Sequence, residues 1–257
     1  MTEEKFIDMT KKAKKKSGVL YRIILAVLIL IIAFCLYKIG TILYEYYEGT
    51  KEYNSVQQLA GVQADSFTGE VDFDALVKKN KDVKAWIYSK DTVINYPVVQ
   101  GKDNQYYLYR MINGEWNGKG SIFIDYRCEN PFEDFNTIIY GHRMKDGSMF
   151  NSLTKYRDKE YFNQHKKMML ITPEKKYDVQ VFGVVTIAAD SDKYQYSFSG
   201  KDDKQSYLDW IMANSEINTG VTASSEEKIV MLSTCTYEFD DARLVVYGKL
   251  AEMEENK

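Results

Sequence analysis

The sequence is poor in the residues that build disulfide frameworks, metal sites and extended linkers. Its 257 residues include three cysteines, three prolines and two histidines. The cysteines Cys35, Cys128 and Cys235 are too few and too widely spaced for a disulfide framework or a zinc site. No acidic cluster has the form of a calcium loop, so the sequence predicts neither a metal nor another cofactor.

An excess of positive charge is also missing. The chain has 34 Lys and Arg against 37 Asp and Glu, a formal net charge of -3, which argues against a nucleic-acid partner. Hydrophobic residues make up 45% of the chain, which is enough to fill the core of one good-sized domain beside a smaller appendage.

The N-terminal region has the pattern of a membrane anchor. Residues 1–18 are polar and carry lysines at 11, 12, 14, 15 and 16, whereas residues 19–43 are overwhelmingly apolar apart from Arg22 and Lys38. The uninterrupted run would span about 22 Å as a helix, and snorkelling of the two flanking cations extends it toward the roughly 30 Å of a hydrocarbon core. We predict a basic tail at 1–18 that stays in the cytoplasm, one transmembrane helix at 19–43 and an exported remainder.

A cleaved signal peptide is the alternative, because it too has a basic start and an apolar run. No small-x-small cleavage site follows the run, and bulky Phe34 stands where a lipoprotein signal needs a small residue before Cys35. We therefore favour an uncleaved anchor. A stalk that becomes helical is expected at 44–70, and an extracytoplasmic domain at 71–257.

The exported part is expected to be mainly β. Runs rich in β-branched and aromatic residues indicate strands at 85–88, 93–100, 120–126, 136–140, 168–172, 177–188, 229–234 and 244–247. Helical spacing appears at 72–80, with Asp72 as the N-cap, and at 202–214. Pro97 requires a strand edge or a bulge. The long insertion before the last two strands is expected to form one wall of a groove.

The last two strands flank an acidic turn and are predicted to pair as a hairpin or as neighbours. Ser233 and Cys235 then share one face of the first strand. If the pairing is antiparallel, Cys235 and Arg243 approach the same rim of the sheet, and a nearby cation favours the reactive thiolate. A free cysteine is more often a small buried hydrophobe, so the thiol by itself does not indicate catalysis.

A histidine completes a possible reactive set. His165 lies in a polar, basic stretch, whereas His142 follows a strand that has the pattern of a buried one, at a position where chemistry is commonly placed. Together Cys235, His142 and Arg243 could supply nucleophile, general acid/base and oxyanion stabiliser for acyl transfer through a thioester. The sequence alone leaves open whether the three side chains meet.

At these residues the chain resembles the sortases, and in detail their class B. The resemblance rests on the runs NTIIYGH at 136–142, LSTC at 232–235 and RLVV at 243–246, in that order, with a helix-containing insertion before the cysteine strand. The runs INYPVVQ at 94–100 and GSIFID at 120–125 also look like class B. The resemblance implies a closed eight-stranded sortase-type β-barrel with peripheral helices, preceded by the transmembrane helix.

The resemblance also implies an activity. Cys235 would cleave a C-terminal sorting signal of secreted proteins after threonine and form a thioester. His142 would protonate the departing amine and later deprotonate the amine of a peptidoglycan cross-bridge or lipid II. Arg243 would hold the oxyanion, with the N–H of Thr236 as a second donor. The enzyme would be a single-pass protein of a Gram-positive type cell surface.

Weaker candidates for contact with the sorting peptide follow from the same resemblance, namely Ser233, Asn104 and Leu108. Acidic residues of the turn, Asp240 and Asp241, could orient the arginine, although such residues are more often simply solvated.

Two other functions stay open. An L,D-transpeptidase-like enzyme would place His-Gly shortly before Ser-x-Gly-Cys-Arg, whereas here Gly141 precedes His142 and Arg243 follows the cysteine by eight residues. A non-catalytic, membrane-tethered binding ectodomain would use Cys235 only for packing.

Overall fold

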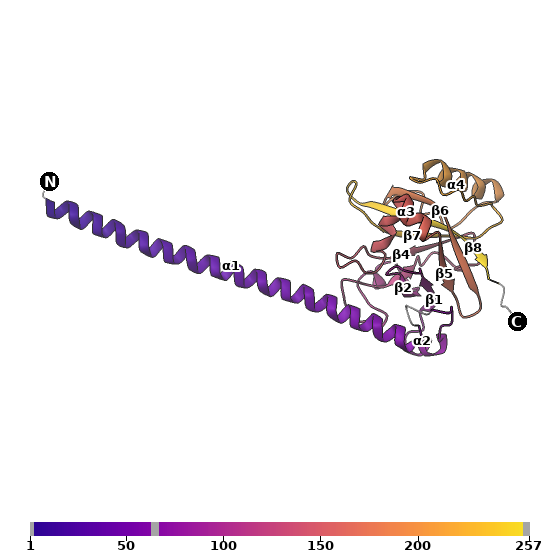
Figure 1. The fold of residues 1–257 in the computed structure, drawn as a ribbon, viewed down its shortest axis with the longest axis horizontal. Coiled ribbons are helices and arrows are strands. Elements are labelled where there is room, and N and C mark those ends of the chain that lie inside the picture. Colours follow the sequence, from indigo (N-terminus) through magenta and orange to yellow (C-terminus); the bar gives the residue numbers. More distant parts are fainter. Residues whose placement is uncertain (1–2, 63–66, 254–257) are drawn as a thin grey trace. The chain divides into compact units, whose positions relative to one another are not determined.

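The computed structural model describes residues 3–62 and 67–253. Contacts divide the chain into two compact units, with the boundary between Glu48 and Gly49. The first unit is the larger part of helix α1, Glu3–Leu59 (Figure 1). From Val19 this helix is long and apolar enough to cross a membrane. The expected apolar N-terminal helix is therefore confirmed as a candidate span.

The second unit is a closed barrel of eight strands, as predicted. The strands are β1 Val83–Tyr88, β2 Asn95–Val99, β3 Ile122–Ile124, β4 Asn136–Tyr140, β5 Lys167–Ile171, β6 Lys176–Ala188, β7 Ile229–Cys235 and β8 Ala242–Glu252. Around the barrel they follow the order β1-β2-β3-β4-β7-β8-β6-β5. The peripheral helical elements are α2 Phe73–Lys79, η2 Tyr106–Leu108, η3 Asn151–Arg157, α3 Lys159–Gln164 and α4 Lys201–Asn214.

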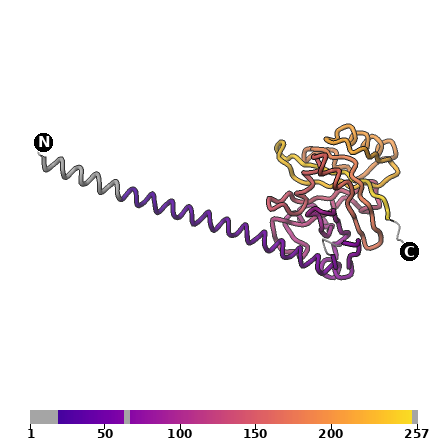
Figure 2. Tube along the Cα trace, viewed as in Figure 1, coloured from indigo at the N-terminus to yellow at the C-terminus, as the bar shows by residue number. Residues whose placement is uncertain are grey.

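Two helices lie on opposite sides of this barrel in Figure 1, α2 at the bottom and α4 at the top, where α4 packs against β6. The winding of the chain between them is visible in the Cα trace (Figure 2). Helix α2 begins as predicted, because the side chain of Asp72 accepts a hydrogen bond from the N–H of Ala75 at 2.8 Å. With the last turns of α1 it covers the outer side of β1 and β2, where Val56, Leu76 and Trp86 are fully buried in one cluster.

The central strands explain why the sequence pattern there is apolar without alternation. Strand β4 pairs in parallel with β7, from Asn136 beside Ile229 to Tyr140 beside Ser233. One face of each strand packs inside the barrel and the other lies under peripheral segments, so β7 is buried up to Thr234. The carboxyl ends of both strands therefore reach the same rim.

Two local details refine the sequence expectations. Pro97 lies in β2 and pairs with Trp86 of β1. On its other side β2 pairs with β3 only from Val98 onward, so the N–H that proline lacks is not needed for the β2–β3 pairing. The expected strand 120–126 shortens to β3, and its start is set by Gly120. This residue has φ +55°, and a Cβ there would approach the carbonyl oxygen of Leu108 to 2.3 Å.

Adjacent residues of α2 offer a matched test of this packing. Leu76 is 0% exposed, whereas Val77 is 42% exposed. Replacing Leu76 with alanine should lower the free energy of unfolding by about 2–5 kcal/mol, because the cavity left behind adds to the lost burial. Val77→Ala should change it by less than about 0.5 kcal/mol. Urea denaturation measures both, and equal effects would show that α2 does not pack as described.

Candidate active site

A cleft of about 270 Å³ opens where β4, β7 and β8 meet the rim of the barrel. Thr236, Asp240 and Asp241 do not line it, whereas the candidate catalytic and peptide-binding residues all do, namely Cys235, His142, Arg243, Ser233, Asn104 and Leu108. These side chains come from four separate parts of the chain. The structure thus answers what the sequence left open, because the thiol, the imidazole and the guanidinium share one cavity.

The cysteine and the arginine are brought together by strand register. In the antiparallel ladder of β7 and β8, Cys235 and Arg243 are direct partners in the last pair before the turn. Side chains of directly opposed residues lie on the same face of a sheet. Cys235 is half-buried, whereas Cys128 is buried and Cys35 is exposed. Burial raises the pKa of the Cys128 thiol to about 11, which leaves it protonated at neutral pH.

The histidine is placed by the glycine before it. The N–H of Gly141 donates to the carbonyl of Ser233 at 3.1 Å, which extends the β4–β7 pairing by one residue. A Cβ at Gly141 would lie 2.5 Å from Ile122 Cδ1 and 2.6 Å from Phe150 Cδ2. A glycine is needed there because real side chains do not approach so closely. The carbonyl of His142 then accepts from the N–H of Phe150 at 2.9 Å and closes the following loop.

The imidazole is oriented by a backbone carbonyl. Nε2 of His142 lies 2.6 Å from the carbonyl oxygen of Leu108. Since a carbonyl only accepts, Nε2 carries a hydrogen, and Nδ1 is the nitrogen that can gain or lose a proton. Burial lowers the pKa of His142, the hydrogen bond to Leu108 opposes this, and the charge of Arg243 lowers the pKa further. Neutral imidazole is therefore favoured.

The arginine is held by its own strand. Its Nη1 donates to the carbonyl of Ala242 at 3.0 Å. That carbonyl also accepts from the N–H of Thr236 at 3.0 Å, as part of the strand pairing. The expected second oxyanion donor is therefore not available in this conformation, because the N–H of Thr236 is already used. Asp240 and Asp241 are exposed, and the hydrogen bond that the structure gives for the Arg243 side chain goes to Ala242 rather than to either carboxylate.

Sequence reasoning missed the aromatic residues of the cleft. Tyr194, on the connection between β6 and α4, lines it together with Tyr140 and Phe123. Its hydroxyl lies 2.8 Å from Ser233 Oγ. Burial raises the pKa of Tyr194, so the hydroxyl stays protonated and can donate. The insertion was correctly expected to form a wall of the groove, but nothing in a chain with 21 tyrosines marked this one.

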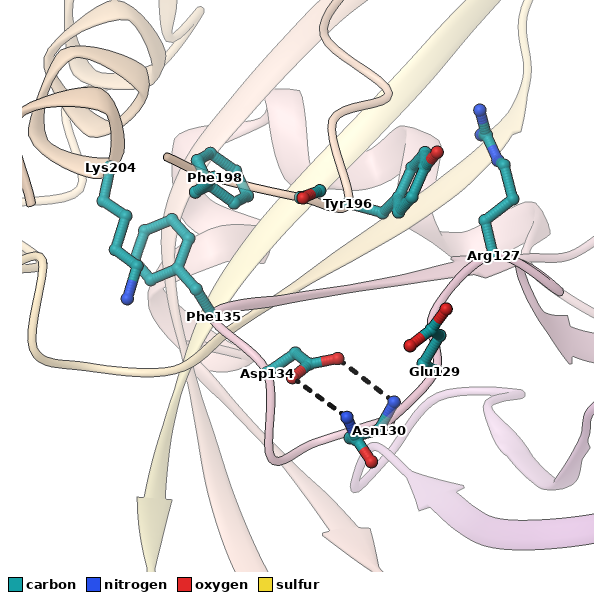
Figure 3. Close-up of a pocket in the computed structure, with 9 residues that line it drawn as sticks. Arg127, Glu129, Asn130, Asp134, Phe135, Tyr196, Phe198 and Lys204 are labelled. Atoms are coloured by element: carbon teal, nitrogen blue, oxygen red, sulfur yellow. Dashed lines mark hydrogen bonds between the residues drawn. The ribbon is translucent and has the colours of Figure 1, made fainter. Parts of the chain in front are cut away.

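A second cavity of about 370 Å³ lies between the β3–β4 connection and the insertion (Figure 3). Phe135 and Phe198 pack edge to face at one side of it, with ring centroids 4.7 Å apart, and Asn130 hydrogen-bonds Asp134 at its lower side. Its lining includes neither a cysteine nor a histidine, so it lacks the thiol and the imidazole of the first cleft. No cluster of His, Cys, Asp or Glu suited to a metal ion occurs among residues 3–62 and 67–253.

Comparison with known proteins agrees with this geometry. The Sortase domain family model matches residues 87–251. Sortase B of Listeria monocytogenes is 41% identical over 177 residues, which cover 68% of this chain and 72% of the relative. Sortase B of Staphylococcus aureus is 32% identical over 243 residues, 93% of this chain and 98% of the relative.

A solved structure, described as sortase B complexed with triglycine, superposes with a TM-score of 0.73 at 33% identity and covers 81% of this chain and 99% of the other. Fold, sequence and the arrangement of strands around the cleft thus lead to one assignment. The chain belongs to the sortase family, in its class B branch, and is a cysteine transpeptidase.

Proposed function

We propose that this enzyme cuts a sorting signal of secreted proteins after threonine and joins the new carboxyl end to an amine of a peptidoglycan cross-bridge or lipid II. One observation carries the proposal. Cys235 and Arg243 are direct partners at the rim of a cleft that also contains His142, whose Nε2 is fixed by a carbonyl. Nucleophile, charged donor and proton carrier are thereby within one site.

In the first step, the Cys235 thiolate attacks the threonine carbonyl. The oxygen becomes negative, and Arg243 is the charged donor placed to bind it. The reacting form is the minority ion pair of thiolate and imidazolium, and as the C–N bond breaks, Nδ1 of the His142 imidazolium gives its proton to the departing amine. The products are a thioester on Cys235, a neutral imidazole and a free amine. Charge balances, because a thiolate and an imidazolium are consumed together.

In the second step, an acceptor amine replaces the sulfur. The acceptor arrives as an ammonium ion and loses one proton to the neutral His142. The resulting amine attacks the thioester, the C–S bond breaks, and the second proton of the new amide nitrogen leaves to solvent. Thiolate and imidazolium are restored. The lowered pKa of His142 supports this step, since it keeps the imidazole neutral and able to accept a proton.

The sorting peptide is expected to lie along the cleft from Cys235 toward the insertion. Ser233, with its hydroxyl 2.8 Å from that of Tyr194, offers a polar contact on the floor. Asn104 accepts from the N–H of Tyr126 through Oδ1 at 3.1 Å, which leaves its amide NH₂ to donate to a peptide carbonyl. Leu108 supplies apolar contact on the same wall.

Membrane anchoring fits this role. We propose a tail at 1–18 in the cytoplasm, a single span at 19–43, a stalk at 44–70 and a catalytic domain at 71–257 on the outside of a Gram-positive type cell. The support is helix α1, which continues through the proposed span and into the stalk region. Basic residues before a span favour this orientation.

Thiol labelling separates an enzyme from a binding ectodomain. In a Cys35→Ser background, a methanethiosulfonate reagent should modify the folded full-length protein at Cys235, which is half-buried in the cleft, and spare buried Cys128. Mass spectrometry of tryptic peptides locates the label. A Cys235 as unreactive as Cys128 would support the role in packing.

Loss of activity in single variants tests the assigned roles. A peptide library incubated with the full-length enzyme in detergent should be cut after threonine. His142→Ala should lower kcat/KM by about 10²–10⁴-fold and Arg243→Ala by about 10²–10³-fold, as for lost general acid and oxyanion donors. Cys235→Ala should form no thioester. Cys128→Ala and His165→Gln serve as matched controls, and full activity of Cys235→Ala would refute the mechanism.

Titration of the imidazole tests the electrostatics of the cleft. The pKa of His142 should lie below the ordinary value of 6.5. Removing a nearby positive charge makes protonation easier, so Arg243→Gln should raise the pKa toward that value. Because the chain has two histidines, NMR of histidine-labelled protein beside the His165→Gln variant assigns the signals. A pKa that falls or stays constant in Arg243→Gln would contradict the proximity of the two charges.

A further inference from the structure

A small hairpin beside the cleft carries two exposed aromatic rings. Arg110 and Trp116 form an antiparallel bridge, and the N–H of Asn117 donates to the carbonyl of Tyr109 at 3.0 Å. The rings of Tyr109 and Trp116 stack with centroids 6.3 Å apart and planes 17° apart. Tyr109 is 47% exposed and Trp116 is 64% exposed. We call these two rings the aromatic surface.

The aromatic surface lies next to His142 of the cleft. The Tyr109 ring centroid is 5.6 Å from that of His142. Leu108, the residue before Tyr109, lines the cleft and holds Nε2 of His142, whereas Tyr109 and Trp116 are not part of the lining. The rings therefore extend outward from the cleft on the side of the imidazole, where amines leave and arrive.

The charge around these rings favours a cation. The face of an aromatic ring carries negative potential and attracts ammonium groups. Exposed Glu115, next to Trp116 at the tip of the hairpin, adds a negative charge. The nearby cation, Arg110, is turned elsewhere, because its guanidinium lies 5.2 Å from the centroid of the Tyr106 ring and its Nη1 donates to the carbonyl of Gly114.

We propose that Tyr109 and Trp116 bind the amine acceptor in its ammonium form and present it to His142. This inference rests on the proposed function, which supplies an acceptor of that class. A peptide α-amine has a pKa of about 7.7–8.0, so the acceptor is largely cationic at neutral pH. The aromatic surface holds it next to the imidazole that accepts its first proton.

The test uses triglycine as the acceptor and a peptide cut in the library assay as the donor, with the full-length enzyme in detergent. Trp116→Leu keeps apolar bulk but removes the ring face, whereas Trp116→Phe keeps a ring. The KM for triglycine should rise about two- to five-fold in Trp116→Leu and stay within about twofold in Trp116→Phe. The rate of thioester formation on Cys235 should stay within about twofold in both.

Two controls isolate the charge. Hydroxylamine attacks thioesters as an uncharged nucleophile at neutral pH, so its KM should not change in Trp116→Leu. Tyr106→Leu removes a ring with 45% exposure from the same segment. The guanidinium of Arg110 already lies over that ring, so the ring is not open to an ammonium group. The KM of this variant for triglycine should stay at the wild-type value.

Three kinetic results would overturn the inference. They are an unchanged KM for triglycine in Trp116→Leu, an equal rise for hydroxylamine, and an equal loss in thioester formation, which would assign the rings to the departing peptide. Weaker binding of Trp116→Leu to lipid vesicles, with an unchanged KM, would assign them to the membrane and overturn it too. Absence of any thioester in the wild-type enzyme would instead refute the proposed function.

Discussion

The pairing of β7 with β8 is the constraint on which the site depends. In this register Cys235 and Arg243 are direct partners, and both side chains reach the same cleft. A slip of one residue would send every side chain of one strand to the opposite face. Alternate residues of both strands pack inside the barrel and most of the others are buried on its outer side, so a slip would exchange the two sets and disrupt the packing on both faces. Packing far from the cleft thus sets the position of the Cys235 thiol.

The second requirement is the parallel neighbour of β7. Strand β4 ends beside Ser233, and the hydrogen bond from Gly141 continues the ladder toward His142. The absence of a side chain at Gly141 lets the chain pass between Ile122 and Phe150. A third segment then contributes the carbonyl of Leu108, which sets the tautomer of the histidine. Three separate segments must therefore fold correctly before the imidazole can exchange protons through Nδ1.

Strand pairing also limits how the oxyanion can be bound. The N–H of Thr236 closes the β7–β8 ladder on Ala242, and the same carbonyl receives Nη1 of Arg243. A backbone donor next to Cys235 would require that ladder to open. The guanidinium of Arg243 has further N–H groups and needs no such change, so in the proposed mechanism its charge provides the main stabilisation. The burial that keeps His142 neutral also strengthens the attraction between Arg243 and a negatively charged oxygen, because water screens charges less there.

The sequence by itself determined the apolar N-terminal helix, the strands of the barrel and the candidate residues Cys235, His142 and Arg243, because hydrophobic periodicity and rare residue types are local properties. Only the tertiary structure decided that these side chains share a cleft, since their meeting depends on pairings between strands distant in the chain. It also decided which groups the N–H of Thr236 and the hydroxyl of Tyr194 bond. The partner of an N–H or a hydroxyl is set by neighbours in space, which no local pattern records.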